Sequence, residues 1–353
     1  MVYNALAGYF GTAGMTYGAP IAYRWRCDAC GPRSIETESD SYRLLLGMEG
    51  QLGSWDYSWG VARASSKSSS VLVSGYHYMD QLKAALGSGL VNPFLAPGQA
   101  QSAAAIAALD AASAAGVRLY GGESILTQID ATFSGELGWG LPGGAVMMAT
   151  GIDLRREQYR FEGDSRETAR GIFNAPFDDA NALDKVHRDV KAVFAEFYLP
   201  LHERLDVTLA GRYDHYSGFG GTTNPKVSFK WQPVDSLAFR GAYSTGFKVP
   251  GFNQLFNGVS EQQYAGLDLA DPATCPGGRA NENVPGCELI RPTELFGGKA
   301  DLKPEESKQR SLGVVYSPTD RFHLSLDWWQ IERLETIRAA ARDVLIDNYD
   351  QFT

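Results

Sequence analysis

The sequence predicts an all-β protein: an antiparallel transmembrane β-barrel with long extracellular loops and a short helical insertion. Three observations predict this fold class. Apolar and polar residues alternate with a period of two in segment after segment, as in strands with unlike faces. Short turns alternate along the chain with long polar excursions, which is the loop asymmetry of bacterial outer-membrane barrels. No run of 18 apolar residues occurs, so the sequence offers no transmembrane helix.

The alternation divides each expected strand into a lipid-facing and a lumen-facing row. The expected lipid-facing residues are Trp55, Tyr57, Trp59, Val61, Val207, Leu209, Gly211, Tyr213, Val227, Phe229, Trp231, Leu237, Phe239, Tyr243, Phe322, Leu324, Leu326 and Trp328. The expected lumen-facing residues are Asp56, Ser58, Ala62, Asp206, Thr208, Arg212, Asp214, Lys226, Ser228, Lys230, Ala238, Arg240, Ala242, Ser244, Arg321, His323, Ser325 and Asp327. This pattern predicts about ten strands, with sheet edges before about Gly53 and beyond about Val344.

The connections predict which end of the sheet is which. Pro-, Gly- or Asp-containing turns occupy residues 141–144, 232–235 and 317–320, whereas polar excursions run from about 160 to 185 and from about 247 to 306. Short periplasmic turns and long extracellular loops are typical of outer-membrane barrels. Trp55, Trp139 and Trp231 lie beside the short turns, where an aromatic girdle belongs. Ordinary aromatic residues at the edge of a core would look the same.

One region breaks the strand pattern. Residues 80–115 are rich in Ala, and the run from Gln101 to Leu109 favours helix strongly. We expect one or two helices within a long extracellular loop.

The four cysteines form two close pairs. Cys275 and Cys287 bracket turn-forming Gly, Pro and Asn residues, and pairs in polar loops indicate disulfides of an oxidising compartment. Cys27 and Cys30 are expected to form a disulfide as well, although their spacing also suits zinc or a redox dithiol. A zinc site needs about four ligands, and no second Cys-x-x-Cys motif or His pair completes one here.

Composition and motifs exclude several functions. A net charge of −9 gives no basic footprint for nucleic acid. The five His residues are scattered, and Gly218-Phe219-Gly220-Gly221 lacks the Lys of a phosphate loop. The adjacent Asp178 and Asp179 indicate a solvated loop, with calcium as an alternative. We therefore expect no enzyme, no catalytic residue, no cofactor and no metal site. The N-terminus has no signal-peptide pattern.

Several short motifs together resemble the TonB-dependent receptors of the bacterial outer membrane. Glu196-Phe197-Tyr198-Leu199-Pro200-Leu201 and Arg212-Tyr213-Asp214 resemble the starts of successive barrel strands in that family. The stretch from Arg240 to Pro250 resembles its strand entering a long loop, and Leu302-Lys303-Pro304-Glu305-Glu306-Ser307 its return strand. Leu141-Pro142-Gly143-Gly144 and Asn92-Pro93-Phe94 match a family hairpin and a loop signature. The resemblance spans about residues 42 to 350.

The resemblance implies active uptake of a scarce nutrient, such as a ferric siderophore, cobalamin or an oligosaccharide. The whole chain, residues 1–353, is expected to be a fragment of a 22-strand barrel domain. The family's N-terminal plug domain, with its TonB box, and the last strands have no match in it. The implied partners are outer-membrane lipid, the nutrient at the extracellular loops, and TonB acting through the plug.

The candidate site residues are the basic side chains of the expected lumen wall: Arg212, Lys226, Lys230 and Arg240. In a whole receptor such a wall meets the plug, water and an anionic substrate. These charges would equally serve only to hydrate the wall and contact the plug. Two other functions stay open: a self-contained passive channel, and a soluble β-rich carbohydrate-binding protein.

Overall fold

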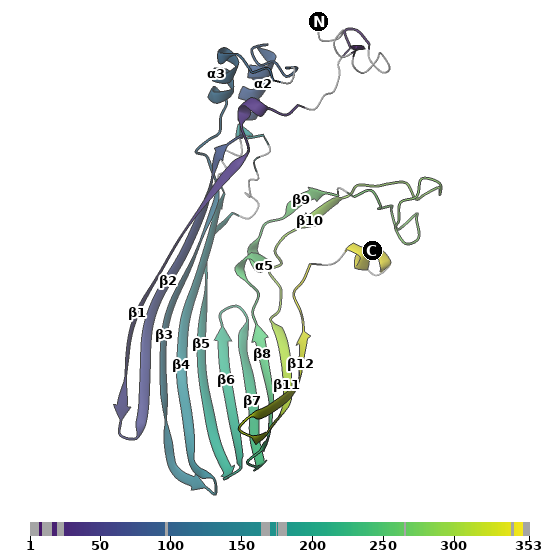
Figure 1. Cartoon of the computed structure of the whole chain (residues 1–353). Helices are drawn as coiled ribbons and strands as arrows, with labels where there is room; N and C mark the ends of the chain where they lie inside the picture. The colour runs from purple at the N-terminus through teal and green to yellow at the C-terminus, as the bar shows by residue number, and fades with distance from the viewer. Residues whose placement is uncertain are drawn as a thin grey trace. The chain divides into compact units, whose positions relative to one another are not determined.

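The computed structural model describes residues 7–8, 16–19, 25–95, 98–163, 170–173, 175, 182–264, 266–339 and 342–348. Ten of its strands form one antiparallel sheet in the order β1-β2-β3-β4-β5-β6-β7-β8-β11-β12 (Figure 1). Each strand therefore lies beside the strand that precedes it in this sheet. Asp178 and Asp179 lie outside the described residues.

The strands alternate with two kinds of connection. Their bounds are β1 Ser34–Leu52, β2 Trp55–Ser74, β3 Arg118–Leu141, β4 Gly144–Gly163, β5 Leu183–His202, β6 Leu205–Tyr216, β7 Gly220–Val234, β8 Leu237–Lys248, β11 Glu305–Thr319 and β12 Phe322–Leu334. Two-residue turns at 53–54, 142–143, 203–204, 235–236 and 320–321 close one end of the sheet. This confirms the predicted short turns.

The opposite end carries the long connections. The β2–β3 connection holds helices α2 (Met79–Gly87) and α3 (Ala103–Ala111), as the Ala-rich stretch predicts. The β8–β11 connection holds α5 (Phe252–Phe256) and a two-stranded sheet of β9 (Ser260–Gln263) and β10 (Thr293–Phe296). The β6–β7 connection is an exception, because it spans only residues 217–219.

The sheet is open within the part of the chain that the structure describes. Its edge strands are β1 and β12. The first edge lies where the sequence predicts it, before Gly53. The predicted second edge was wrong: β12 ends at Leu334, and Val344 lies in helix α6 (Arg342–Asp347). The sheet therefore ends with the alternating residues of β12. The residues around Val344 form a helix and do not extend the alternation.

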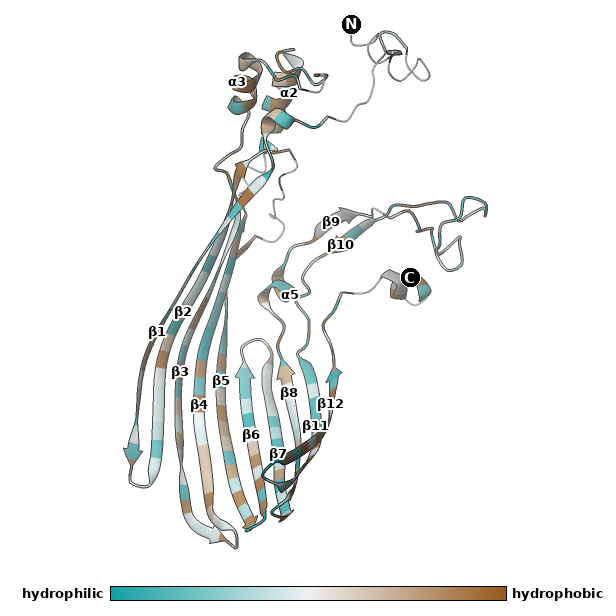
Figure 2. Cartoon of the chain, in the orientation of Figure 1, coloured by the Kyte–Doolittle hydropathy of each residue, from teal (hydrophilic) through white to brown (hydrophobic). Residues whose placement is uncertain are grey.

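Register fixes which residues share a face of the sheet. Leu209 pairs with Val227, Phe229 with Gly241, and Phe239 with Val314, so all lie on one face, here called the apolar face. Arg212 pairs with Asn224 and Lys230 with Arg240 on the other, the polar face. Apolar and polar residues alternate along the strands in Figure 2. Large apolar side chains are exposed on the apolar face: Ile152, Leu154, Val193, Leu209, Tyr213, Val227, Trp231, Leu312, Leu324, Leu326 and Trp328. A sheet with this exposed face suits hydrocarbon rather than water.

The chain divides into two compact units. Unit 1 contains residues 1–40, 67–122 and 162–179, and unit 2 the remainder. In unit 1, Leu72, Tyr76 and Leu119 form one small core with Ala114 and Ile172. A second core joins Ala105 and Leu109 of α3 to Ala85 of α2, with Trp25, Cys27 and Cys30 packed against it. These contacts explain why the Ala-rich run folds as short helices, since each buries only a narrow apolar stripe.

Both cysteine pairs are joined by disulfides in the structure. Cys27 precedes the short helix η1 (Asp28–Cys30) and Cys30 is its last residue, and their Cα atoms are 5.2 Å apart. The Cα atoms of Cys275 and Cys287 are 4.9 Å apart, and both residues are buried against Ala270. The second bond closes a local loop within the β8–β11 connection.

No helix among the described residues is long and apolar enough to cross a membrane.

The assignment of faces predicts opposite effects of the same substitution on adjacent residues. Leu209→Arg places a charge on the apolar face of β6 and should cost roughly 2–4 kcal/mol near the membrane midplane. Thr208→Arg, on the polar face, should be tolerated. Heat-modifiable electrophoretic mobility of the outer-membrane protein measures the folded fraction of each variant. Equal folding of the two variants would contradict the assignment.

The Cys275–Cys287 bond should stabilise only its own loop. Replacing both residues with Ser removes a constraint worth roughly 3 kcal/mol in the chain-entropy model. Hydrogen exchange should rise within residues 268–290 while the ten-stranded sheet stays protected. The matched variant, Cys27→Ser with Cys30→Ser, should leave exchange in residues 268–290 unchanged. Faster exchange throughout the sheet in the first variant would refute a local role.

Candidate functional site

The four basic residues expected to line the lumen share the polar face of the sheet. Lys230 and Arg240 lie directly opposite each other on β7 and β8. Lys226 lies opposite Ala210, two residues from Arg212 along the same face of β6. The structure therefore brings the four residues onto one surface. That this surface lines a lumen stays a prediction.

Acidic partners surround Arg212. Its Nε donates to both carboxylate oxygens of Asp214, at 3.0 and 2.9 Å, and its Nη2 donates to Asp153 Oδ2 at 3.1 Å. Asp153 also accepts from Gln128 Nε2 and lies 3.4 Å from Arg155 Nε. The network joins strands β3 to β6, and Asp214 within it is 3% exposed. Arg212 therefore has its charge satisfied by the wall, and its main role here is to cross-link strands.

Arg240 makes a second cross-strand pair. Its guanidinium donates to both oxygens of Asp327, with Nη2 at 2.8 Å from each. Gly313 lies between them in the same rung of β8, β11 and β12. A Cβ at Gly313 would clash with the Asp327 carboxylate and with Arg240. Only glycine at this position leaves room for the pair.

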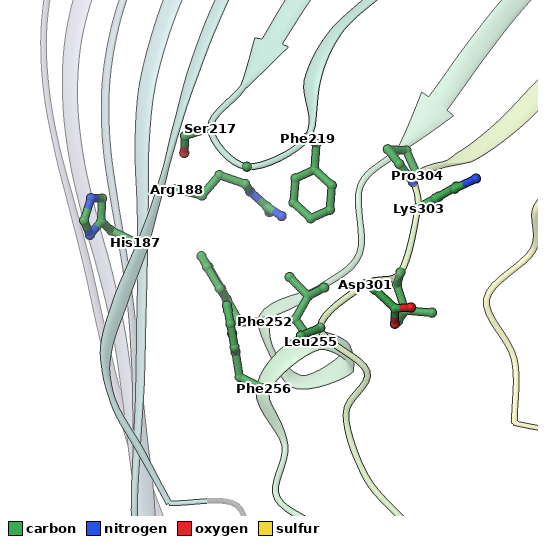
Figure 3. Close-up of a pocket in the computed structure, with 13 residues that line it drawn as sticks. His187, Arg188, Ser217, Phe219, Phe252, Leu255, Phe256, Asp301, Lys303 and Pro304 are labelled. Atoms are coloured by element: carbon green, nitrogen blue, oxygen red, sulfur yellow. The ribbon is translucent and has the colours of Figure 1, made fainter.

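A pocket of about 560 Å³ lies at the loop end of unit 2 (Figure 3). Its walls come from the first part of β5, the β6–β7 turn, helix α5 and the segment before β11. The lining residues are His187, Arg188, Ser217, Gly218, Phe219, Phe252, Leu255, Phe256, Ala300, Asp301, Leu302, Lys303 and Pro304. Aromatic rings and basic residues thus line the same solvent-accessible space.

Arg188 holds this pocket together. It is 9% exposed, and its Nε and Nη2 donate to Glu157 Oε2 at 3.1 and 2.5 Å. Its Nη1 donates to the carbonyl of Pro250 at 2.8 Å, just before α5. The guanidinium also lies 5.0 Å from the ring centroid of Phe252 and 5.6 Å from that of Tyr216. One side chain therefore fixes α5 to the barrel wall.

The short β6–β7 turn completes the pocket. Gly218 and Gly220 have φ of +88° and +82°, so the turn needs glycine at both positions. This conformation presents Phe219 to the pocket (Figure 3). Sequence reasoning identified the glycine cluster as a non-phosphate loop but did not place Phe219, Arg188 or Phe252 in a site. The sequence did carry one signal for this site: Arg188 interrupts an otherwise apolar row, between Val186 and Val190, on one face of a strand.

The comparisons with known proteins agree with this architecture. The family model described as "TonB dependent receptor-like, beta-barrel" matches residues 7–347. The family consists of receptors and transporters rather than enzymes. A curated relative, the probable TonB-dependent siderophore receptor PirA of Acinetobacter baumannii, is 25% identical over 160 residues, which is 45% of this chain and 19% of PirA.

Two solved structures show the same fold. The siderophore receptor PirA from Acinetobacter baumannii superposes with a TM-score of 0.53 at 15% identity. A mutant of the ferric enterobactin receptor PfeA from Pseudomonas aeruginosa gives 0.54 at 13% identity. Each comparison covers 85% of this chain and 35% of the solved chain. The chain thus spans about a third of the length of these receptors.

Replacing Arg188 should release α5 from the wall. Arg188→Leu leaves Glu157 unpaired in a half-buried site and removes the bond to Pro250, a local cost of roughly 3–5 kcal/mol. Hydrogen exchange and proteolysis should accelerate at residues 249–258. The matched control Lys185→Leu changes an exposed cation on the same strand and should alter neither. Unchanged protection of α5 in Arg188→Leu would show that Arg188 does not anchor it.

Proposed function

Because the chain belongs to the TonB dependent receptor-like β-barrel family, we propose that it forms part of the barrel wall of an outer-membrane receptor for TonB-energised nutrient uptake. In this proposal TonB acts through the family's plug domain, and residues 1–353 belong entirely to the barrel domain. The polar face of the sheet, with Arg212, Lys226, Lys230 and Arg240, lines the lumen.

We further propose a ferric siderophore as the nutrient. The observation that carries this proposal is the loop pocket, which Phe219, Phe252 and Phe256 line together with Arg188 and Lys303. Aromatic rings and cations together suit a ligand that is both anionic and aromatic, such as an iron–catecholate complex. PirA and PfeA, which share the fold, are described as a siderophore and a ferric enterobactin receptor.

The alternatives fit the structure less well. A self-contained channel requires β1 to pair with β12, whereas these strands are the two edges of the described sheet. A soluble carbohydrate-binding protein would not expose the row of aliphatic and aromatic residues on the apolar face.

Uptake of ⁵⁵Fe by iron-starved cells tests the proposal. Cells expressing the full-length protein should accumulate an iron–catecholate complex only when TonB is present. Labelled cobalamin and an oligosaccharide, supplied in parallel, should not accumulate. Accumulation without TonB would indicate a passive channel instead. Preferential uptake of either alternative substrate would exclude a siderophore.

Lys303→Gln tests the pocket itself. Loss of a charge-assisted contact of about 1.5–3 kcal/mol should weaken ferric siderophore binding about tenfold or more. Arg291→Gln removes an exposed cation of the same connection outside the pocket and should leave the Kd unchanged. Equal affinities of the two variants would show that the siderophore binds outside this pocket.

A further inference from the structure

The two disulfides differ in burial and in the length of chain that each one closes. Cys275 and Cys287 are 3% and 6% exposed and lie 12 residues apart. Cys27 and Cys30 are half-buried and only 3 residues apart. In the chain-entropy model, a disulfide that closes a shorter loop contributes less to folding. Stability therefore explains the Cys27–Cys30 bond less well than the other, and its residues are more accessible to a reagent.

A cavity of about 490 Å³, here called the unit 1 cavity, borders the Cys27–Cys30 bond. All of its lining residues belong to unit 1. Besides the two cysteines, the residues that matter for its chemistry are Arg26, Arg33, His77 and Phe173. Pockets for small molecules typically have volumes of about 300–1,000 Å³. A small molecule in this cavity therefore has access to the disulfide.

The segment that carries the disulfide is fixed on two sides. The two cysteines pack against the small core that joins α2 and α3 (Figure 1). At the end of β2, Ser74 Oγ donates to the carbonyl oxygen of Pro32 at 2.7 Å. Gly75 follows with φ of +75°, and a Cβ there would lie 2.6 Å from the same oxygen, so only glycine allows this close approach. Neither contact at Pro32 involves a sulfur atom, so this wall of the cavity remains when the bond opens.

Two guanidinium groups give the cavity its positive charge. Arg26 is exposed, and the guanidinium of Arg33 lies 5.7 Å from the ring centroid of Phe173. Burial lowers the pKa of His77, with Asp110 opposing the shift, so its imidazole is neutral at pH 7 and adds no charge. No acidic residue lines the cavity within the part of the chain that the structure describes. Guanidinium groups stabilise a nearby thiolate and bind carboxylates.

From these observations we propose that the Cys27–Cys30 bond is a thiol–disulfide exchange site for an anionic low-molecular-weight thiol, which binds in the unit 1 cavity. The thiolate of the ligand attacks one cysteine Sγ and forms a mixed disulfide with it. The bond between the two cysteines breaks, and the other Sγ leaves as a thiolate with the electron pair.

A second small thiolate completes the reaction. It attacks the ligand sulfur of the mixed disulfide, and the remaining cysteine leaves as a thiolate. The two small thiols are thereby oxidised by two electrons to their own disulfide, and the cysteine pair is reduced by two electrons. The two protons of the small thiols end on the two cysteines through water. This site is independent of which nutrient is taken up.

Reaction of the folded full-length protein with reduced glutathione, an anionic thiol, tests the proposal. Cysteamine, a cationic thiol, is supplied in parallel at the same thiolate concentration. After quenching with N-ethylmaleimide, peptide mass spectrometry counts the glutathionylated and alkylated cysteines over time. Glutathione should open the Cys27–Cys30 bond about tenfold faster than the Cys275–Cys287 bond, because exchange depends on access.

The comparison of the two thiols tests the charge of the cavity. Glutathione should open the Cys27–Cys30 bond about tenfold faster than cysteamine does, which is the effect of one charge-assisted contact. Equal rates at the two disulfides, or equal rates with the two thiols, would overturn the proposal.

Substitution of the two arginines separates the cavity from net charge. Arg26→Gln with Arg33→Gln should abolish the preference for glutathione over cysteamine, whereas the Lys substitutions at both positions should keep it. The matched control, Arg291→Gln with Arg338→Gln, removes two exposed arginines of unit 2 and should also keep the preference. An equal loss in this control would reduce the effect to net charge and refute the site. If the double variant in unit 1 does not fold, Arg26→Gln alone should lower the preference, and an unchanged preference would refute the site.

Discussion

Every backbone N–H and C=O group inside a bilayer must find a partner within the protein, because hydrocarbon offers none. The ladder of ten strands satisfies this constraint along its whole width except at its two edges, β1 and β12. Backbone pairing also determines which face of the sheet each side chain occupies. Register fixes each residue to one face of the sheet. A row of charges such as Arg212, Lys230 and Arg240 is therefore kept away from lipid only if every strand keeps its register.

The ion pairs of the polar face stabilise that register. Arg212 bonds across β4 and β6 to Asp153 and Asp214, and Arg240 bonds across β11 to Asp327. A slip by one residue would move these charges into hydrocarbon, so the pairs select against the wrong register as much as they stabilise the right one. Gly313 contributes to the same pairing, because only a residue without a side chain lets Arg240 and Asp327 meet across β11.

The sequence predicted much of the fold because strand faces and tight turns are local signals. Alternation from Val207 to Tyr213 and the turn at 235–236 need no knowledge of distant residues. The second sheet edge was misplaced because weak alternation near a chain end competes with short helices such as α6. The loop pocket was not predictable, because it depends on contacts between residues far apart in sequence. Arg188 meets Pro250, and Phe219 lines the same pocket as Lys303, only once four separate segments have folded together.

The β8–β11 connection is restrained at two points along its length. Arg188 holds its start through Pro250, and the Cys275–Cys287 bond closes its middle. A segment of more than fifty residues, 249–304, would otherwise lose much conformational freedom when it orders around a ligand. With part of that freedom already removed during folding, less of the interaction free energy is consumed by ordering, and dissociation slows. In the proposed receptor, such a loop would capture a ligand that is present at very low concentration while remaining open to solvent.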